Sequence, residues 1–238
     1  MKKSFIFILL ILFTLPAILA LTKSGFPASH DGEWMVIRLS AFHQSLRDGQ
    51  FPVRWSARLN NGYGYPVFNF LYPLPFYVGE FFYLIFHQFT IAIKWVFIVA
   101  TSASAVTMFI WLKHHFKSLP ALAGALLYIY TPYLFVDIYV RGSIGEALGF
   151  VFVPLIFLSV DLLTKKPKLG IVIGALSAAA TILSHNVFII FVFLAAVYAL
   201  VTLPHRAWWN LGIMLAIGAA LSAYFWLPAI AELKFVRA

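Results

Sequence analysis

The sequence contains no cysteine and few charged residues. Of its 238 residues only 11% are charged, while 63% are hydrophobic, against roughly a quarter charged in an ordinary soluble domain. Without cysteine the chain cannot form disulfides, thiolate metal sites or a cysteine nucleophile. A soluble core of this length cannot bury so much apolar surface. The composition therefore excludes an ordinary soluble domain and indicates a protein whose solvent is lipid.

The formal net charge of +9 does not indicate nucleic-acid binding. The basic residues occur singly or in short clusters between apolar stretches, and they do not line one face of an element. That distribution is typical of the loops that set membrane topology, not of a phosphate-binding surface. We expect membrane lipid as a partner and no nucleic acid.

Several stretches are long and apolar enough to cross a bilayer, which takes about 20 residues as a helix. The seven predicted spans are 4–22, 91–112, 119–139, 145–163, 168–184, 187–203 and 208–228. Ala20 would suit signal-peptidase cleavage after the first stretch, but the later spans favour a retained helix. The sequence therefore predicts an all-α, polytopic transmembrane helix bundle of about seven spans.

A further apolar stretch, Tyr72–His87, decides the orientation of every later span. It is short, contains two prolines near its start and carries Glu80. If it does not cross, most basic residues of the short loops and the termini lie on the N-terminal side of the membrane, as the positive-inside rule requires of cytoplasmic loops. These residues are Lys2, Lys3, Lys113, Lys117, Lys165, Lys166, Lys168 and Arg206, against Arg141, Lys234 and Arg237 on the other side. We predict a multi-pass protein of the cell membrane with a cytoplasmic N-terminus and an interfacial helix at Tyr72–His87.

The chain then forms a single membrane domain, 1–238, in which 23–90 is a long outer loop with interfacial helices. Within that loop Glu33–Arg47 has helical periodicity, with Met35, Leu39 and Phe42 on one face. Because the chain stops soon after the last predicted span, we expect it to be the N-terminal part of a longer protein.

Three polar groups fall on this outer side. They are His30, Asp31 and Glu33 after the first span, Asp137, Arg141 and Glu146 between the third and fourth, and His185 with Asn186 after the fifth. Ionisable residues at membrane depth are costly and by default indicate a functional site. We predict Asp31, Asp137 and Glu146 as catalytic acids or bases, with Arg141, His185, Glu33 and His30 in substrate binding. Asp31 and Asp137 are also candidate ligands of a divalent metal, Mg or Mn.

Each group also has a structural explanation. Asp31 can cap the helix that follows it, Asp137 and Glu146 can pair with Arg141 to neutralise the loop, and His185 can cap a helix end. Elsewhere, we expect Glu80 to be solvated, and Asp161 to pair with Lys165 or Lys166.

The outer segments carry the motifs H-D-G-E-W, R-D-G-Q-F-P-V-R-W, N-N-G-Y-G-Y-P-V-F-N-F-L-Y-P-L-P, R-G-S-I-G-E-A-L and L-S-H-N. With these motifs the chain resembles the membrane proteins of the 6-pyruvoyl-tetrahydropterin synthase-related domain family. The resemblance extends over most of the sequence. Nothing in the sequence resembles the soluble pterin enzyme itself.

More distantly, the layout is similar to the GT-C type membrane glycosyltransferases, although neither outer loop has a D-x-D motif. In that superfamily the outer acids bind a metal or activate the acceptor, and the donor is a polyprenyl-phosphate sugar. The resemblance implies those roles for Asp31, Glu33, Asp137 and Glu146. Two alternatives stay open: a non-enzymatic membrane scaffold, and a transporter or flippase of a lipid-linked substrate, which would favour broken helices at the bilayer midplane.

Overall fold

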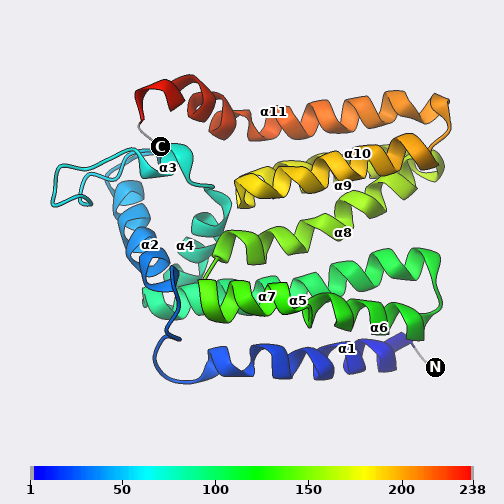
Figure 1. Ribbon diagram of the computed structural model, residues 1–238, viewed down its shortest axis with the longest axis horizontal. Coiled ribbons are helices and arrows are strands. Elements are labelled where there is room, and N and C mark those ends of the chain that lie inside the picture. Colours follow the sequence, from blue (N-terminus) through cyan, green and yellow to red (C-terminus); the bar gives the residue numbers. More distant parts are fainter. Residues whose placement is uncertain (1–2, 237–238) are drawn as a thin grey trace.

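The computed structural model describes residues 3–236, so Lys2 and Arg237, which entered the charge count above, lie outside the described residues. Within 3–236 the chain forms helices and their connections, with a single isolated β-bridge between Ser56 and Tyr65. The helices run side by side along one long axis (Figure 1). The predicted all-α bundle is confirmed.

Seven passes run along this axis, alternating in direction (Figure 1). They are α1 (Lys3–Ile18), α5 (Phe89–His115), α6 (Ser118–Ile129) continued by α7 (Pro132–Val136), α8 (Ile144–Lys165), α9 (Pro167–Ser184), α10 (Ile189–Thr202) and α11 (Trp208–Glu232). Six of these passes are long and apolar enough to cross a membrane, and the pass through α10 is a shorter apolar helix, Asn186–Thr202. The chain is a multi-pass integral membrane protein with a helix at each of the seven predicted spans.

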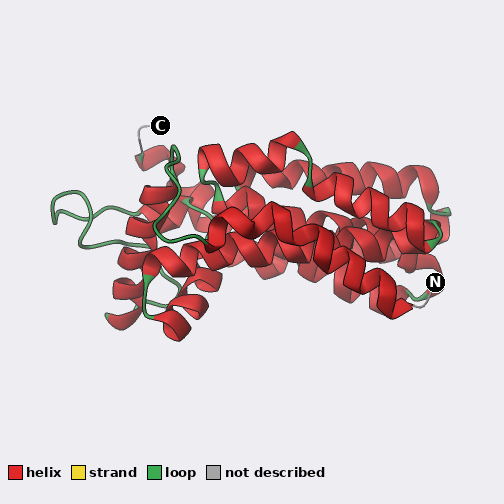
Figure 2. Ribbon diagram, turned by 90° about the horizontal axis from the view of Figure 1, so that it is seen from below, coloured by secondary structure: helices red, strands yellow, loops and turns green. Residues whose placement is uncertain are grey.

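Three helices gather at one end of the bundle, which we call the loop end. They are α2 (Gly32–Arg47), α3 (Val67–Phe70) and α4 (Leu74–Phe86). Figure 1 shows α2 lying across the bundle axis there, and Figure 2 shows the same end from below. The stretch Tyr72–His87 therefore does not run through the bundle. The chain's first described residue and the basic connections after α5, α8 and α10 lie at the opposite end, the N-terminal end.

The apolar face of α2 fixes it across the loop end. Met35, Leu39 and Phe42 are buried, as their helical spacing predicts. The Phe42 ring lies 5.1 Å from Phe68 and 5.8 Å from Phe76, measured between ring centroids. These aromatic contacts join α2 to α3 and α4, so the long connection after α1 packs as part of the fold.

Two prolines inside the lengthwise helices free a carbonyl one turn earlier, and another segment satisfies each carbonyl. Pro154 in α8 frees the Phe150 carbonyl, which accepts a hydrogen bond of 2.8 Å from the Tyr128 hydroxyl. Pro228 in α11 frees the Tyr224 carbonyl, which accepts one of 2.9 Å from the Arg54 guanidinium.

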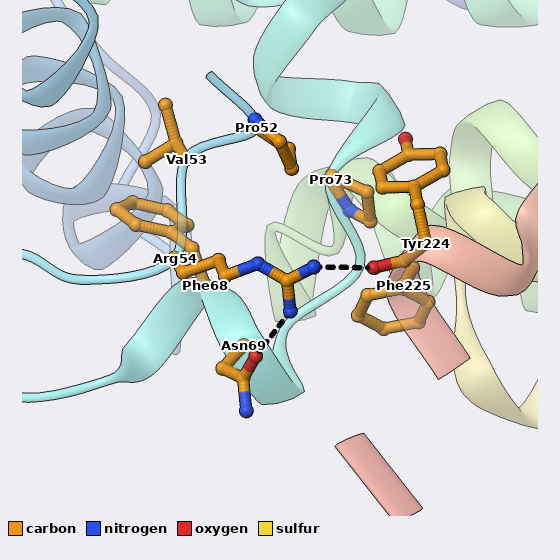
Figure 3. A pocket seen from close by; sticks show the side chains of 8 residues that line it. All are labelled: Pro52, Val53, Arg54, Phe68, Asn69, Pro73, Tyr224 and Phe225. Atoms are coloured by element: carbon orange, nitrogen blue, oxygen red, sulfur yellow. Dashed lines mark hydrogen bonds between the residues drawn. The ribbon is translucent and has the colours of Figure 1, made fainter. Parts of the chain in front are cut away.

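Arg54 also donates to the Asn69 side chain at 2.9 Å (Figure 3). Asn69 in turn donates to Glu232 at 2.9 Å. One arginine of the long loop thus holds the bent helix α11 against the loop end.

Two carboxylates, those of Glu80 and Asp161, make contacts that differ from the predicted ones. Glu80 is not solvated, because α4 turns it toward α2, where its Oε1 lies 2.8 Å from His43 Nδ1. Asp161 faces α5 and α10, so its hydrogen bonds go to His115, Trp111 and Tyr198 at 2.7, 3.0 and 2.8 Å. Lys165 and Lys166, its expected partners, are exposed at the helix end.

Candidate functional site

The segment before α2 docks directly on the connection between α7 and α8. The backbone N–H groups of His30 and Asp31 donate to the carbonyls of Val140 and Arg141, each at 2.8 Å. Gly142 allows this approach: its φ is +72°, and a Cβ there would lie 2.5 Å from the backbone nitrogen of Gly32. Two of the three predicted polar groups are therefore adjacent.

The second group forms a compact ion cluster. Asp137–Arg141 is a π-helical turn, a form that often marks functional sites. The Arg141 guanidinium lies 2.7 Å from Asp137 Oδ1 and 2.5 Å from Glu146 Oε1, while the Tyr133 hydroxyl donates to Glu146 Oε2 at 2.5 Å. Both carboxylates are almost completely buried, whereas Arg141 is 38% exposed. The structural explanation of this loop, pairing of both acids with Arg141, is confirmed.

The third group joins the same cluster through His185. Its Nε2 lies 3.6 Å from Glu146 Oε1, and its Nδ1 accepts from the Val187 backbone N–H at 3.3 Å, so the neutral ring carries its proton on Nε2, facing Glu146. Burial lowers the pKa of His185, with the Glu146 carboxylate acting in the opposite sense. His185 is also the residue that caps the 3₁₀ turn at Asn186–Phe188, as its structural explanation predicts.

The first group stays at the surface. His30, Asp31 and Glu33 are exposed. Asp31 is the N-cap residue of α2, but its side chain makes no capping hydrogen bond; the Ser29 hydroxyl accepts from the Gly32 N–H instead, at 3.2 Å. Side-chain capping therefore does not account for Asp31, and its carboxylate is accessible to a ligand.

Tyr72 and Arg38 belong to this site but were not among the predicted site residues. Burial raises the pKa of Tyr72 to about 12, the Arg38 charge acts against this rise, and the Glu146 and Asp31 charges add to it. The Tyr72 ring also packs on His185, with centroids 4.7 Å apart. Arg38 could have been found from its spacing, since it lies two helical turns after Asp31. Tyr72 carries no such pattern.

Unpartnered polar atoms also concentrate at this end. Among residues 3–236, the buried side-chain N and O atoms without a hydrogen-bond partner belong to Arg38, Ser56, Glu80, Ser104, Asp137 and Ser184. All but Ser104, which lies within α5, are at the loop end. Such groups are rare in folded proteins and mark places where a ligand, a water or a functional demand competes with folding.

An apolar pocket of about 620 Å³ on the side of the bundle, called the lateral pocket, reaches a neighbour of the ion cluster, Tyr133. Met108, Leu127, Phe150 and Phe191 are among its lining residues, and so is Tyr133, whose hydroxyl donates to Glu146. The pocket opens between lengthwise helices, where lipid surrounds a membrane protein. An apolar chain lying in it would place its polar end at Tyr133 and the cluster.

The side chains do not favour a resident metal. The part of the chain that the structure describes contains no group of three or more His, Asp or Glu residues arranged to hold an ion. Asp137 already uses Oδ1 to accept from Arg141, and Asp31 is exposed. A hard cation needs several oxygen ligands, so a metal between Asp31 and Asp137 stays a prediction and no chemical step below depends on it.

Comparison with known proteins adds one relative. No protein-family model matches the chain, and no solved structure shows significant similarity. An uncharacterized protein of Lactococcus lactis subsp. cremoris (strain MG1363) is 25% identical over 193 residues, covering 78% of this chain and 31% of the relative. The chain thus spans about a third of the length of the protein it matches, and that protein carries no assigned activity.

Proposed function

We propose that this membrane protein is a GT-C-like glycosyltransferase that transfers a sugar from a polyprenyl-phosphate donor at the loop end. The observation that carries the proposal is the junction of three features. The lateral apolar pocket is lined in part by Tyr133, whose hydroxyl donates to Glu146; the Arg141 cation pairs with Glu146; and the backbone of the exposed Asp31 is docked on the Arg141 carbonyl. A lipid-linked phosphosugar has the matching order of parts: an apolar chain, an anionic phosphate and a polar sugar.

These groups have different roles in the proposed reaction. Asp31 takes the proton of an acceptor hydroxyl, whose oxygen forms a bond to the sugar C1. The bond between C1 and the phosphate oxygen breaks, and polyprenyl phosphate leaves with the electron pair. Arg141, 38% exposed, offers part of its guanidinium to the developing negative charge. Asp137 and Glu146, which the resemblance casts as catalytic, here orient Arg141, and His185 faces Glu146.

Donor consumption tests the proposal. The full chain is reconstituted in liposomes with a polyprenyl-phosphate hexose radiolabelled in the sugar, and loss of label from the lipid phase is followed with and without a cell-envelope extract as acceptor. Asp31→Asn should lower the rate at least about 100-fold, the usual contribution of a general base. Asp48→Asn is the matched control, because Asp48 is an exposed acid at the other end of α2. No consumption above protein-free liposomes, or equal rates for both variants, would overturn the proposal.

One observation favours a non-enzymatic scaffold as the second candidate. Arg141 pairs with both buried carboxylates, which is all that a structural loop requires of them. A scaffold would fold normally, consume no donor and be indifferent to Asp31→Asn.

A further inference from the structure

A second pocket opens at the loop end, away from the lateral pocket and beside α2. Its volume is about 530 Å³, and it is lined by Trp34, Ile37, Arg38, Leu59, Asn60, Asn61 and Tyr65. Its lining residues come from α2 and from the loop before α3, and Figure 1 shows that loop projecting from the bundle. Nothing in the proposed transfer of the donor uses these residues.

The projecting loop has a defined shape. Ser56 and Tyr65 form the isolated bridge, with backbone hydrogen bonds of 3.1 and 3.2 Å. Between them the Leu59 carbonyl accepts from the Gly64 N–H at 2.9 Å. Asn60 and Asn61 both have left-handed backbones, with φ of 56° and 54°, a conformation that asparagine tolerates better than most residues. Both asparagines line the pocket.

The lining combines one large aromatic surface with several hydrogen-bonding groups. Trp34 is 56% exposed, and each asparagine supplies both donors and acceptors. Arg38 lines the same pocket, and its Nε is buried without a hydrogen-bond partner among the described residues. This mixture does not suit a lipid chain, which has no hydrogen bonds to make. It suits a ring that is apolar on one face and carries hydroxyls around its edge, which is the chemistry of a saccharide.

Two residues that line the pocket, Trp34 and Arg38, lie near the candidate catalytic site in the sequence of α2. Asp31, Trp34 and Arg38 follow one another at helical spacing on α2, so they share one side of that helix. The charges of Arg38, Asp31 and Glu146 all act on the Tyr72 hydroxyl. A ligand in the pocket would therefore lie within a helical turn of the proposed general base.

We propose that the pocket between α2 and the loop 59–65 binds a saccharide, the hydroxyl-bearing acceptor of the transfer, with a sugar ring packed on Trp34 and its hydroxyls bonded to Asn60, Asn61 and Arg38. That this saccharide is the acceptor rests on the proposed function. That the pocket binds a saccharide does not rest on it, because binding is measured without turnover.

Isothermal titration calorimetry on the full chain in nanodiscs is the test, with maltose and cellobiose as saccharide probes and inorganic phosphate as the anion probe. At least one disaccharide should bind, and Trp34→Ala and Asn60→Ala should each weaken it about tenfold or more. Trp34→Tyr should recover most of the affinity, because a flat ring is retained. The matched control is Trp209→Ala, since Trp209 is 77% exposed at the N-terminal end of the bundle.

Four outcomes would overturn the inference: no binding of either disaccharide, unchanged binding in Trp34→Ala, an equal loss in Trp209→Ala, or binding of phosphate alone, which would make the pocket an anion site. Donor consumption separates this failure from failure of the proposed function. A chain that consumes donor but binds no saccharide here has its acceptor elsewhere, whereas saccharide binding without donor consumption leaves a sugar-binding site in a protein that is not a transferase.

Discussion

The two ends of the bundle both hold carboxylates with little exposure, but they satisfy them in different ways. At the N-terminal end, Asp161 receives hydrogen bonds on both oxygens from three side chains, on α5 and α10. At the loop end, two acids share the single cation of Arg141, and within residues 3–236 the buried Oδ2 of Asp137 has no hydrogen-bond partner.

This difference between the two ends indicates where a ligand could bind. A carboxylate whose oxygens are all bonded ties helices together and has no capacity left for a ligand. The loop end differs: it has buried polar atoms without hydrogen-bond partners among the described residues, an exposed acid and two nearby pockets. Such an arrangement is poorly optimised for folding alone. Four substitutions test this contrast between the structural N-terminal end and the loop end, where we propose the site.

The largest effect is expected from Arg141→Met. Removing this guanidinium leaves Asp137 and Glu146 as buried, uncompensated charges, and breaking a buried pair costs about 3–5 kcal/mol. The free energy of unfolding, measured by urea titration in detergent micelles with circular dichroism, should fall toward the lower figure because Arg141 is partly exposed. Arg206→Met, an exposed arginine at the N-terminal end, should stay within about 0.5 kcal/mol. Equal effects would remove the contrast between the two ends.

The second-largest effect is expected from Gly142→Ala. Alanine at a left-handed position costs about 1–2 kcal/mol, and here its Cβ would also meet the backbone of Gly32. Gly49→Ala separates the two costs, since Gly49 has a φ of +88° and nothing within 4 Å of an added Cβ. Thermal melting should rank Gly142→Ala well below Gly49→Ala. Because the docked segment carries Asp31, donor consumption should fall in Gly142→Ala alone. Indistinguishable melting temperatures would mean that the docking of residues 30–31 contributes little.

A smaller effect, at the structural end, is expected from Asp161→Ala. It leaves the Trp111 N–H and the Tyr198 hydroxyl without an acceptor, at about 1–2 kcal/mol. Melting temperature should drop, whereas donor consumption and saccharide binding by the folded fraction should not change. Loss of either activity at a temperature where the variant is folded would show that the N-terminal end is not purely structural.

The smallest expected effect is the contribution of His185 to the pH dependence of stability. Burial holds the pKa of His185 below its ordinary 6.5, against the Glu146 carboxylate and with the Arg141 charge. The folded state then binds fewer protons than the unfolded state in the window just below pH 6.5, so His185 contributes stability above that pH and loses it as pH falls through its folded pKa. Melting temperatures from pH 7.5 to 5.5 should decline more steeply for the parent protein than for His185→Asn. Parallel curves would assign the pH dependence to other groups.

Much of the fold could be predicted from the sequence, because lipid imposes simple demands. Long uncharged runs gave all seven passes, and the distribution of lysines excluded Tyr72–His87 from them. The periodicity of Met35, Leu39 and Phe42 predicted the buried face of α2. The partners of Glu80 and Asp161 could not be predicted, since both residues bond across helices, and sequence spacing shows only neighbours along one helix.

The candidate site, too, could be predicted from the sequence only in part. The exposed acids and the pairing of Asp137 and Glu146 with Arg141 followed from ionisable residues placed near the ends of spans. The sequence did not predict the contact of Tyr72 with His185 or the pocket beside Trp34. Nor did it predict that Nε of Arg38 is buried without a hydrogen-bond partner among the described residues.

What the sequence determined by itself is the membrane-spanning, alternating helical architecture, because each span must satisfy its own backbone hydrogen bonds and cover itself with apolar side chains. The tertiary structure alone decided which polar groups meet. The site is built from segments that are far apart in the chain: residues 30–31, 72, 137–146 and 185. They converge because a Cβ is absent at Gly142, where the backbone of Gly32 approaches, and at Gly145, where the Tyr72 ring and the Ser184 carbonyl approach.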